Sequence, residues 1–512
     1  MSRGKQRLNC PDAIPVPGGD CRLGHREVSV GVVGGGIAGL SAACILAERG
    51  VEVVVYEKSS FWGGRTGAWA ETLSDGTPFQ MERGFHAFFR QYYNLRELLK
   101  RIDPQLSILR ELDDYPIVSP TGTESFSRLS KRVPINLAQL VYRTDSMGWR
   151  DLLRVNVRVA LAMVSYQQDA VYRLYDAMTA KAYLDNLNFP PRARCMLFDV
   201  FAHSFFNPEE HMSAAELLMM FHFYFTGNPE GLVFDIATAP FSTLWQPLVN
   251  KLEEQGVHFV PDTEVVQVKP LASGMALEIR GRERVNHVNH DAVVLATDVS
   301  ALKRLVSTSN ELSDPGFCQS IDSLAVTSPF AVWRMWLDTP VARERAPFAG
   351  TTGVGLLDNI SVYELIEDES KNWVDRHGGS IVELHAYAVS PNLNEGSIRE
   401  ELLAALHKLY PETKGALIQH DRFILSQDCP AFAPNSHRLR PTVWTPYSNL
   451  TVAGDFVKLP LPSALMERAC TSGFIAANRL LANWGVRSEP IYTVPLNGLV
   501  PSRFLPRPTA LA

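Results

Sequence analysis

The sequence has few of the features that mark proteins of membranes or nucleic acids. No run among its 512 residues approaches the roughly 18 uninterrupted apolar residues of a membrane-spanning helix. Basic residues do not exceed acidic ones, since 49 Lys and Arg stand against 55 Asp and Glu for a formal net charge of -6. This balance argues against a nucleic-acid partner, which would require a basic surface. Any contact with a membrane is therefore expected to be peripheral.

Cysteine motifs are also missing. The 7 cysteines are scattered, and none of them has the C-x-x-C or metal-ligand spacing of a redox or zinc site, so no metal is expected. This usage is typical of a reduced, cytoplasmic compartment. Residues 1–27 are rich in Gly, Pro and charge and lack the apolar core of a signal peptide. We expect them to form a flexible N-terminal extension.

What the sequence does contain is a nucleotide-binding pattern near its start. An apolar run at residues 28–33 predicts a strand, and the turn G-x-G-x-x-G follows at residues 34–39. A helix is expected over residues 37–49 and a second strand over residues 51–56, which delivers Glu57 at its carboxyl end. The elements come in the order strand, glycine turn, helix, strand and acid that a dinucleotide site requires.

Each glycine of this turn has a separate physical reason. Gly34 permits the tight turn, Gly36 lets the backbone approach a pyrophosphate, and Gly39 lets the helix pack against the strand. The helix that begins with Ile37 and Ala38 directs its positive end and its unpaired amides toward the phosphates. The pattern therefore predicts a pyrophosphate site at this helix terminus.

A second motif favours FAD over NAD. Glu57 is placed to accept hydrogen bonds from a ribose diol, and Lys58 follows it as a further cofactor-binding candidate. Gly63, Gly64 and Arg65 then supply a second glycine pair with a fixed cation, which can contact the other side of the same pyrophosphate. FAD is accordingly the predicted cofactor.

Further along, the chain leaves the nucleotide domain and returns to it. Residues 98–224 have mostly helical spacing. Helices are predicted over residues 137–141, 152–164, 214–225, 241–255 and 463–484. Strands are predicted over residues 257–268, 291–297, 330–337, 381–389 and 450–455, of which 291–297 suits a buried parallel sheet.

These elements predict an α/β fold with a Rossmann-like FAD-binding domain built from discontinuous segments and an α+β substrate domain. The FAD-binding domain is expected to comprise residues 28–100, 231–300 and 440–485. The substrate domain is expected to comprise residues 101–230 and 301–439. A proline-rich tail, residues 486–512, is expected to be loosely held.

The order of these motifs resembles the FAD-dependent amine oxidase and carotenoid desaturase superfamily, over nearly the whole chain after residue 27. The most discriminating segment is residues 81–96, MERGFHAFFRQYYNLR, which is similar to carotenoid aryl-ring synthases of the isorenieratene synthase type, β-carotene desaturase/methyltransferases. Residues 452–460 and 466–478 are similar to the same group. The resemblance thus implies an amine oxidase and phytoene desaturase type of fold.

The resemblance also implies further site residues. The backbone of Val265 would meet the adenine, while Gly454 and Asp455 would lie near the ribityl chain and pyrophosphate. The following helix, which carries Met466, would place its N-terminus near the flavin ring. Where many desaturases have Gly-Ala in this helix, residues 468–469 are Arg-Ala, which puts the local geometry in doubt.

The segment from Gly84 to Phe89 would lie beside the isoalloxazine. His86 in this segment is the one candidate catalytic residue, because an imidazole titrates in the range of a proton acceptor. A hydrogen-bonded core histidine is the alternative. Phe221, Phe223, Tyr224 and Phe225 suit either a polyene tunnel or a plain helical core.

The implied activity is an FAD-dependent oxidoreductase of carotenoid biosynthesis. It would desaturate the β-ionone ring of a β-carotene-like carotenoid with 1,2-methyl migration and give an aromatic end group. The sequence has no G-x-S-x-G and no S-adenosylmethionine signature, so the methyl would come from the substrate. The alternatives are a desaturase or isomerase of linear polyenes, an amine oxidase, and a non-catalytic lipid-binding protein.

A carotenoid resides in a bilayer, so the enzyme is expected to be cytoplasmic and peripherally associated with the membrane. Residues 152–163, with Arg154 and Arg158 among apolar side chains, are the candidate contact. A buried helix of the substrate domain is the alternative for this segment. The sequence names no electron acceptor for the flavin.

Overall fold

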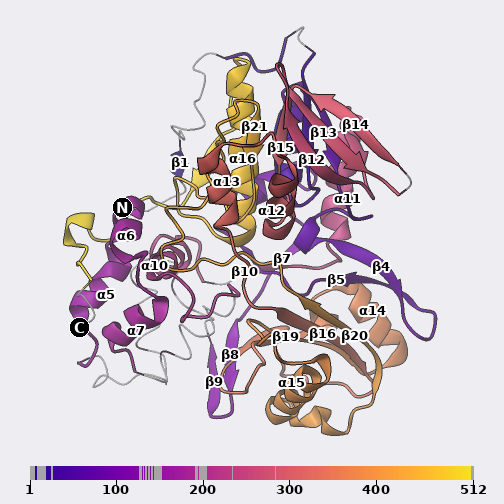
Figure 1. Cartoon of the computed structure of the whole chain (residues 1–512). Helices are drawn as coiled ribbons and strands as arrows, with labels where there is room; N and C mark the ends of the chain where they lie inside the picture. Colours follow the sequence, from indigo (N-terminus) through magenta and orange to yellow (C-terminus); the bar gives the residue numbers. More distant parts are fainter. Residues whose placement is uncertain are drawn as a thin grey trace.

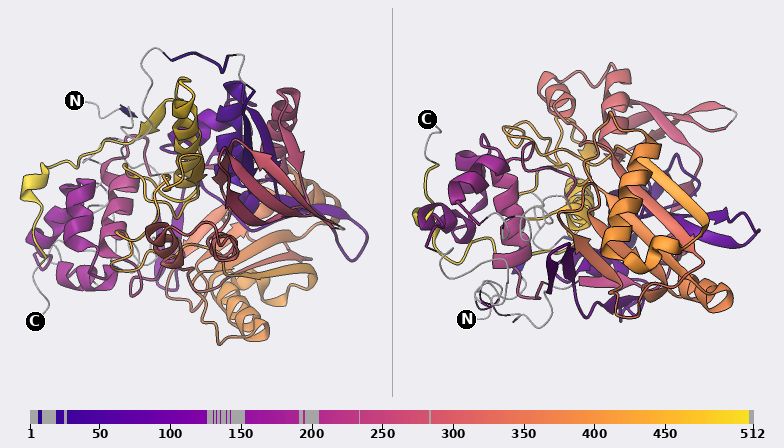
Figure 2. Two further views of the ribbon diagram at one scale, coloured as in Figure 1. Left: turned by 45° about the horizontal axis from the view of Figure 1, so that its top comes forward. Right: turned by 90° about the horizontal axis from the view of Figure 1, so that it is seen from below.

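The computed structural model describes residues 6–8, 19–24, 27–125, 153–190, 205–232, 234–282 and 284–508, together with residues 130, 132, 135, 139, 142 and 194. Figure 1 places helix α16 (Leu465–Asn483) beside strands β15 (Ala292–Leu295) and β21 (Leu450–Val452) in its upper half. A large sheet with helices α14 (Asp368–His377) and α15 (Glu395–Leu409) lies in the lower half, on the right. In both views of Figure 2 the magenta helices lie to one side, apart from the orange sheet.

The centre of the upper half is a parallel sheet. Its strands have the spatial order β11 (His258–Val260), β3 (Glu52–Tyr56), β2 (Ser29–Val33), β15 and β21. Helix α1 (Ile37–Glu48) links β2 to β3, as the glycine motif predicts. Val30, Val32 and Val294 are fully buried because both faces of this sheet are covered, one by α1 and α16 and the other by a small three-stranded sheet that includes Leu277 and His290. The predicted nucleotide-binding elements are thus confirmed to within about two residues at each end.

Helix α16 packs along α1 on the parallel sheet of the upper half. A β-carbon at Gly473 would lie 2.3 Å from the carbonyl oxygen of Ala38, so only glycine lets the two helices approach this closely. The chain returns after more than 400 residues to complete the layer that α1 begins.

Further elements flank this half. A second small sheet has the order β12 (Glu264–Pro270), β13 (Met275–Arg280) and β14 (Val285–His290). The helices beside these sheets are α11 (Ser242–Glu254), α12 (Val299–Thr308) and α13 (Pro315–Asp322). Strands and a helix were predicted at residues 257–268, 291–297 and 241–255, and the structure confirms all three.

The large sheet of the lower half is mainly antiparallel. Its strands have the order β20 (Ile418–Ser426), β16 (Phe330–Leu337), β19 (Ser380–Ala386), β18 (Asn359–Val362), β17 (Phe348–Thr351), β8 (Pro116–Ser119) and β9 (Gly122–Ser125). Every residue of β16 and β19 is buried. The predicted strands at residues 330–337 and 381–389 therefore pair in one sheet, since Ala331 lies opposite Ala386.

The expectation that residues 98–224 are mostly helical is partly wrong. Helices α2 (Tyr93–Leu99), α5 (Val157–Val164), α6 (Gln168–Tyr175), α7 (Ala180–Leu187) and α10 (Ala214–Phe221) are present. Strands β7 (Leu109–Glu111), β8 and β9 interrupt them, because short strands with mixed polarity leave little periodicity to detect. The predicted helix at residues 137–141 lies outside the described residues, apart from residue 139.

Small sheets join the two halves. One has the order β6 (Phe88–Phe89), β10 (Phe234–Ala237) and β7, and another pairs β4 (Ala68–Thr72) with β5 (Pro78–Glu82). The segment that the sequence singles out at residues 81–96 begins at the end of β5, contains β6 and ends in α2. This segment therefore lies at the junction of the two halves.

Residues 6–8 of the expected N-terminal extension and residues 491–494 of the expected tail are held in the fold, so these residues are not loose, while the flexibility expected of the rest of the extension stays a prediction. Strand β1 (Gln6–Leu8) pairs antiparallel with β22 (Ile491–Thr493). Ile491 and Val494 are buried in the main core. The proline-rich composition predicts a loose tail, but apolar residues between the prolines are buried in the core, and this burial holds that part of the tail in place. Within the described residues, no helix has the length and apolarity needed to cross a membrane.

Candidate FAD and substrate site

The first glycine turn forms an open cradle at the N-terminus of α1. Gly34 has φ +109°, and a β-carbon there would lie 2.5 Å from the carbonyl oxygen of Ala296. A β-carbon at Gly39 would lie 1.9 Å from the oxygen of Gly34, so Gly39 serves helix packing. At Gly36 a β-carbon would meet only the α-carbon of Gly64, at 3.8 Å. The space above Gly36 is therefore open to a ligand.

The first turn of α1 lacks a side-chain cap. Its N-cap residue is Gly36, and no side chain accepts from the amides that follow it. Ile37 and Ala38 line the same cavity as Gly36. Unpaired amides at a positive helix end form a site for an anion such as a pyrophosphate.

Glu57 is held in place at the end of β3. Its Oε2 accepts from the amide of Gly35 at 2.7 Å, and its Oε1 accepts from the amide of Ser59 at 2.8 Å. The residue is buried but lines the cavity. A carboxylate oxygen has a second lone pair, so each can still accept a hydrogen bond from a hydroxyl.

The second glycine pair lies directly against the first turn, as the sequence predicts. The amide of Gly63 donates to the carbonyl of Gly35 at 2.9 Å, and Gly63 forms an isolated bridge with Gly36. Arg65 then reaches Asp455, with 2.6 Å between Nη2 and Oδ1. A guanidinium near the start of the chain and a carboxylate near its end thus form one wall.

A cavity of about 1370 Å³ joins these groups. Of the predicted site residues, it is lined by Gly34, Gly36, Ile37, Ala38, Glu57, Lys58, Gly63, Gly64, Arg65, His86, Val265, Gly454, Asp455 and Met466. Gly39 and Gly84 do not line it. Gly84 has φ +97°, and a β-carbon there would lie 2.5 Å from Cε1 of His385. Its role is close packing rather than contact with the cavity.

His86 is half-buried on the cavity wall. Its Nδ1 lies 2.7 Å from the carbonyl oxygen of Gly84, so Nδ1 carries the proton and Nε2 is free to accept one. The pKa of His86 is lowered to about 4, mainly by burial, with smaller contributions from His385 and Arg65 nearby, and the hydrogen bond that His86 donates to the Gly84 carbonyl opposes this shift only in part. The imidazole is therefore neutral at physiological pH and only a weak base.

Arg468 does not disturb the cavity. Its buried side chain points away, donating from Nε to the carbonyl of Ser463 at 2.7 Å and pairing through Nη2 with Glu216 on α10. Ala469, not Arg468, lines the cavity. The doubt that the Arg-Ala pair raises about local geometry is thus resolved, because the arginine braces the start of α16 from behind.

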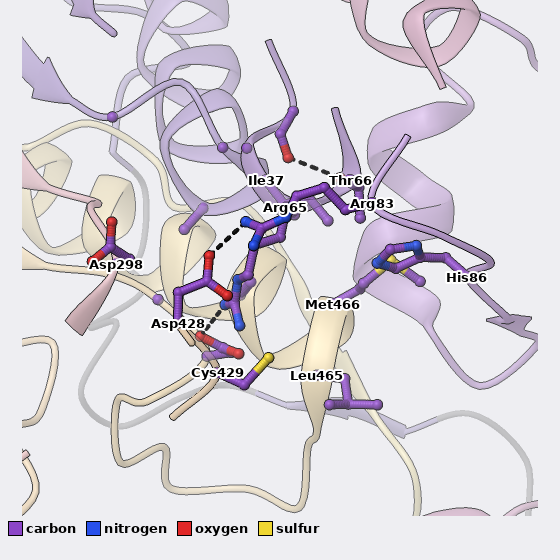
Figure 3. A pocket seen from close by; sticks show the side chains of 18 of the residues that line it. Ile37, Arg65, Thr66, Arg83, His86, Asp298, Asp428, Cys429, Leu465 and Met466 are labelled. Carbon is purple, nitrogen blue, oxygen red and sulfur yellow. Dashed lines mark hydrogen bonds and ion pairs between the residues drawn. The ribbon is translucent and has the colours of Figure 1, made fainter. Parts of the chain in front are cut away.

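Several wall residues have no motif in the sequence. Arg83 pairs with Asp428, with 2.5 Å between Nη1 and Oδ2, and Cys429 follows on the same wall. Figure 3 shows the side chains of Arg65 and Arg83 both directed toward the wall that holds Asp428 and Cys429. No periodicity or spacing marks residues 428–429, which only the fold brings to the site.

Aromatic side chains form much of the cavity wall. Phe85 stacks on Phe348 with ring centroids 4.3 Å apart, and both line the cavity. Of the aromatic residues at 221–225, Tyr224 and Phe225 line it, whereas Phe223 is buried in the core. Their helix changes to a π-helix at His222–Thr226. Tyr224 and Phe225 therefore form part of the cavity wall, whereas Phe223 is a core residue.

The residues fit FAD on structural grounds. An uncapped helix end lies beside open space at Gly36, a fixed carboxylate stands one strand away, and a cation closes the opposite side. The cavity is large enough to hold both a dinucleotide and part of a substrate.

Comparison with known proteins agrees with this assignment. A family model described as flavin containing amine oxidoreductase matches residues 37–481. A carotenoid phi-ring synthase of Streptomyces griseus is 46% identical over 98% of this chain and 96% of that protein. A carotenoid phi-ring synthase of Chlorobaculum tepidum is 29% identical over 91% of this chain and 90% of that protein.

Solved structures show the same fold. A triple mutant of putrescine oxidase is 16% identical with a TM-score of 0.66, covering 89% of this chain and 99% of its own. Cyclohexylamine oxidase from Brevibacterium oxydans is 14% identical with a TM-score of 0.62, covering 90% and 99%. The predicted α/β fold, the FAD cofactor, the oxidoreductase class and the resemblance to aryl-ring synthases are confirmed. The chain belongs to the family of flavin-containing amine oxidoreductases.

Proposed function

We propose that this enzyme aromatises the β-ionone ring of a β-carotene-like carotenoid and produces a φ-type end group. The observation that carries the proposal is the single cavity that joins the glycine cradle to an aromatic-lined chamber. Near full-length identity of 46% to a carotenoid phi-ring synthase supports the substrate class and the φ product.

In this proposal FAD is held by the uncapped start of α1 and by Gly36 and Gly64 at its pyrophosphate. Glu57 binds the ribose, and the backbone at Val265 meets the adenine. Asp455 and Arg65 close the remaining side. Bound FAD supplies a hydride acceptor, which an aromatisation requires twice for each ring.

The methyl group comes from the substrate itself. A gem-dimethyl carbon blocks aromatisation, so one methyl must move to the neighbouring carbon as a cation forms. Each converted ring then loses two hydrides and two protons. The protein needs a dry and shaped chamber for this chemistry rather than a nucleophile or a methyl donor.

The aromatic wall suits such a cation in two ways. It excludes water, which would otherwise capture the cation and end the reaction as an alcohol. The faces of rings such as Phe85, Phe348 and Tyr224 carry negative potential, which stabilises a nearby positive charge. These residues would therefore act by shape and electrostatics.

The substrate reaches the enzyme from a bilayer in this proposal. Helix α5 begins at Val157, with Asn156 as its cap, so the helix expected from Leu152 starts five residues later. Leu152 itself lies outside the described residues. Leu153 and Val157 are 78% and 75% exposed beside Arg154 and Arg158. Exposed apolar side chains next to cations suit a peripheral contact with anionic lipid.

The test is pigment analysis after expressing the protein in cells that accumulate β-carotene. A product lighter by four hydrogens per converted ring, with the spectrum and retention of a φ-ring standard, is expected. Unchanged β-carotene would refute the proposal. Conversion seen only in cells that accumulate linear carotenes would instead support a polyene desaturase, an activity named for a Synechocystis relative that is 23% identical.

A further inference from the structure

A chain of hydrogen bonds leads from the cavity wall to a buried ion pair beneath Gly84. Tyr387 and His385, both on or just after β19, line the cavity. The hydroxyl of Tyr387 lies 2.9 Å from Nδ1 of His385, and Nε2 of His385 lies 2.7 Å from Oε1 of Glu383. Glu383 in turn accepts from Nε of Arg334 at 2.8 Å.

The ionised carboxylate at one end of this chain determines which atom donates in each hydrogen bond. Glu383 is fully buried, which would raise its pKa, but Arg334 and His385 together hold the pKa at about 2. The carboxylate is therefore ionised and can only accept, so Nε2 of His385 carries the proton. In the neutral imidazole Nδ1 then accepts from the hydroxyl of Tyr387, whose oxygen accepts from the side-chain amide of Asn359 at 2.9 Å.

The position of Tyr387 gives this chain access to a ligand. Its half-buried ring packs against Phe206, with centroids 4.5 Å apart, and Phe206 also lines the cavity. The arrangement joins a tyrosine of the cavity wall, through its hydroxyl, to a histidine and an orienting carboxylate. This is the logic by which a weakly reactive hydroxyl is made into a proton acceptor.

The proposed reaction requires such an acceptor, because every oxidation of the ring releases one proton as well as one hydride. His86 is a poor candidate, since it is a weak base in its buried setting. We propose that Tyr387 is the catalytic residue that accepts the ring proton, with His385 and Glu383 as positioning residues behind it. This inference rests on the proposed function.

The step balances as a proton transfer without a change of oxidation state. A C–H bond of the cationic ring breaks, and its electron pair remains in the ring as a new C=C bond. The proton bonds to the Tyr387 oxygen while the hydroxyl proton of Tyr387 passes to Nδ1 of His385. The resulting imidazolium is paired with the Glu383 carboxylate, so the positive charge moves from the substrate into a site prepared for it.

The deciding experiment compares Tyr387→Phe with the unaltered protein, because this change keeps the ring against Phe206 and removes only the hydroxyl. With purified flavoprotein and β-carotene in micelles without oxygen, the rate of flavin bleaching reports hydride loss. We expect that rate to stay within about threefold, since hydride loss precedes the proton transfer. Aryl product in β-carotene-accumulating cells should fall by roughly 100-fold per folded protein.

His385→Gln provides a second test, because it keeps Tyr387 in place and can still donate to Glu383. It should show the same split between flavin bleaching and aryl product, a pattern that a packing defect would not cause. Tyr410→Phe is the control, because Tyr410 is a more deeply buried tyrosine of the same half that does not line the cavity. Its bleaching and its aryl product should both match the unaltered protein.

The outcomes separate this inference from the function on which it rests. If the unaltered protein forms no aryl product, the proposed function fails. If it does and Tyr387→Phe or His385→Gln forms aryl product at the same rate, Tyr387 is not the acceptor. If Tyr387→Phe loses its flavin, the split between flavin bleaching and aryl product in His385→Gln decides whether Tyr387 is the acceptor. Loss of aryl product in His86→Ala, with full activity in Tyr387→Phe, would transfer the role to His86.

Discussion

Single side chains at this site are held by the protein before any ligand arrives. Glu57 has two backbone amides on its carboxylate, and Arg65 is paired with Asp455. A group that is already fixed loses little conformational freedom when a ligand binds. Substitutions of such residues should therefore change cofactor binding more than stability.

Replacing Glu57 with Ala removes the acceptor that we assign to the ribose. Loss of hydrogen bonds to a charged group costs about 1.5–3 kcal/mol, so FAD binding should weaken by roughly 10- to 100-fold. Flavin content per purified chain and titration with FAD measure this. Glu52→Ala, at the exposed start of the same strand, is the control and should keep its flavin. Full flavin retention by Glu57→Ala would contradict the assignment.

Arg468 contributes to stability rather than to the cavity. Arg468→Ala leaves Glu216 buried with much of its charge unpaired, which should lower the free energy of unfolding by about 3–5 kcal/mol. Chemical denaturation measures this change. Arg479→Ala, on the same helix but partly exposed, should stay within about 0.5 kcal/mol. Equal stability of the two variants would show that the buried pair is not needed.

The same pair gives the fold a defined sensitivity to acid. Burial opposes the charge of Glu216, but Arg468 and Arg440 hold its pKa at about 2, below the ordinary value of 4.5. The stabilisation is complete above pH 4.5 and is lost as pH falls toward 2, because the unfolded chain binds the proton first. The urea midpoint should fall over that window, and less steeply in Glu216→Gln. An equal slope in both proteins would assign the acid sensitivity to other groups.

Among elements, the βαβ unit could be predicted because every requirement is local. The glycines, the apolar strands and Glu57 all lie within about 30 residues. Strand β19 shows the opposite case. Its residues were predicted as a strand, but nothing in the sequence relates His385 to Gly84, which lies against it only after β5 and β19 reach the same wall. Long-range pairing of this kind leaves no periodic signal.

The glycine turn allows folding and binding to be separated within one element. Gly36→Val places its methyl groups in open space above Gly64, so the protein should fold normally but lose FAD by at least tenfold. Gly39→Val instead collides with the backbone of Gly34 and should unfold the β2–α1 contact. Circular dichroism and flavin content distinguish the two. A stable, flavin-bound Gly36→Val would refute the proposed approach of the pyrophosphate.

In the whole molecule, the strands of the two large sheets alternate along the chain, and the domain bounds inferred from the order of strands and helices stay a prediction. The contacts that this alternation makes across the cavity wall could not be predicted. Asp428 and Arg83 meet although 345 residues separate them. Tail residues such as Ile491 enter the core and β22 pairs with β1, neither of which composition alone reveals.

The exposed apolar residues Leu153, just before α5, and Val157, at its start, allow a test of membrane binding by the whole molecule. The double variant Leu153→Asp and Val157→Asp should bind anionic phosphatidylglycerol vesicles at least tenfold more weakly, because two apolar contacts and local charge balance are lost. Flotation with vesicles measures binding. Val285→Asp, at an exposed site on β14, is the control. Unchanged flotation of the double variant would place the membrane contact elsewhere.

The wall shared by Arg65 and Asp455 also has a consequence for biosynthesis. A ribosome that has translated the glycine turn, Glu57 and Arg65 must add almost 400 further residues before Asp455 and α16 exist. The nascent chain therefore carries an incomplete cradle for most of its synthesis. Flavin capture should come last, as a step that marks a finished chain and locks its first and final segments together.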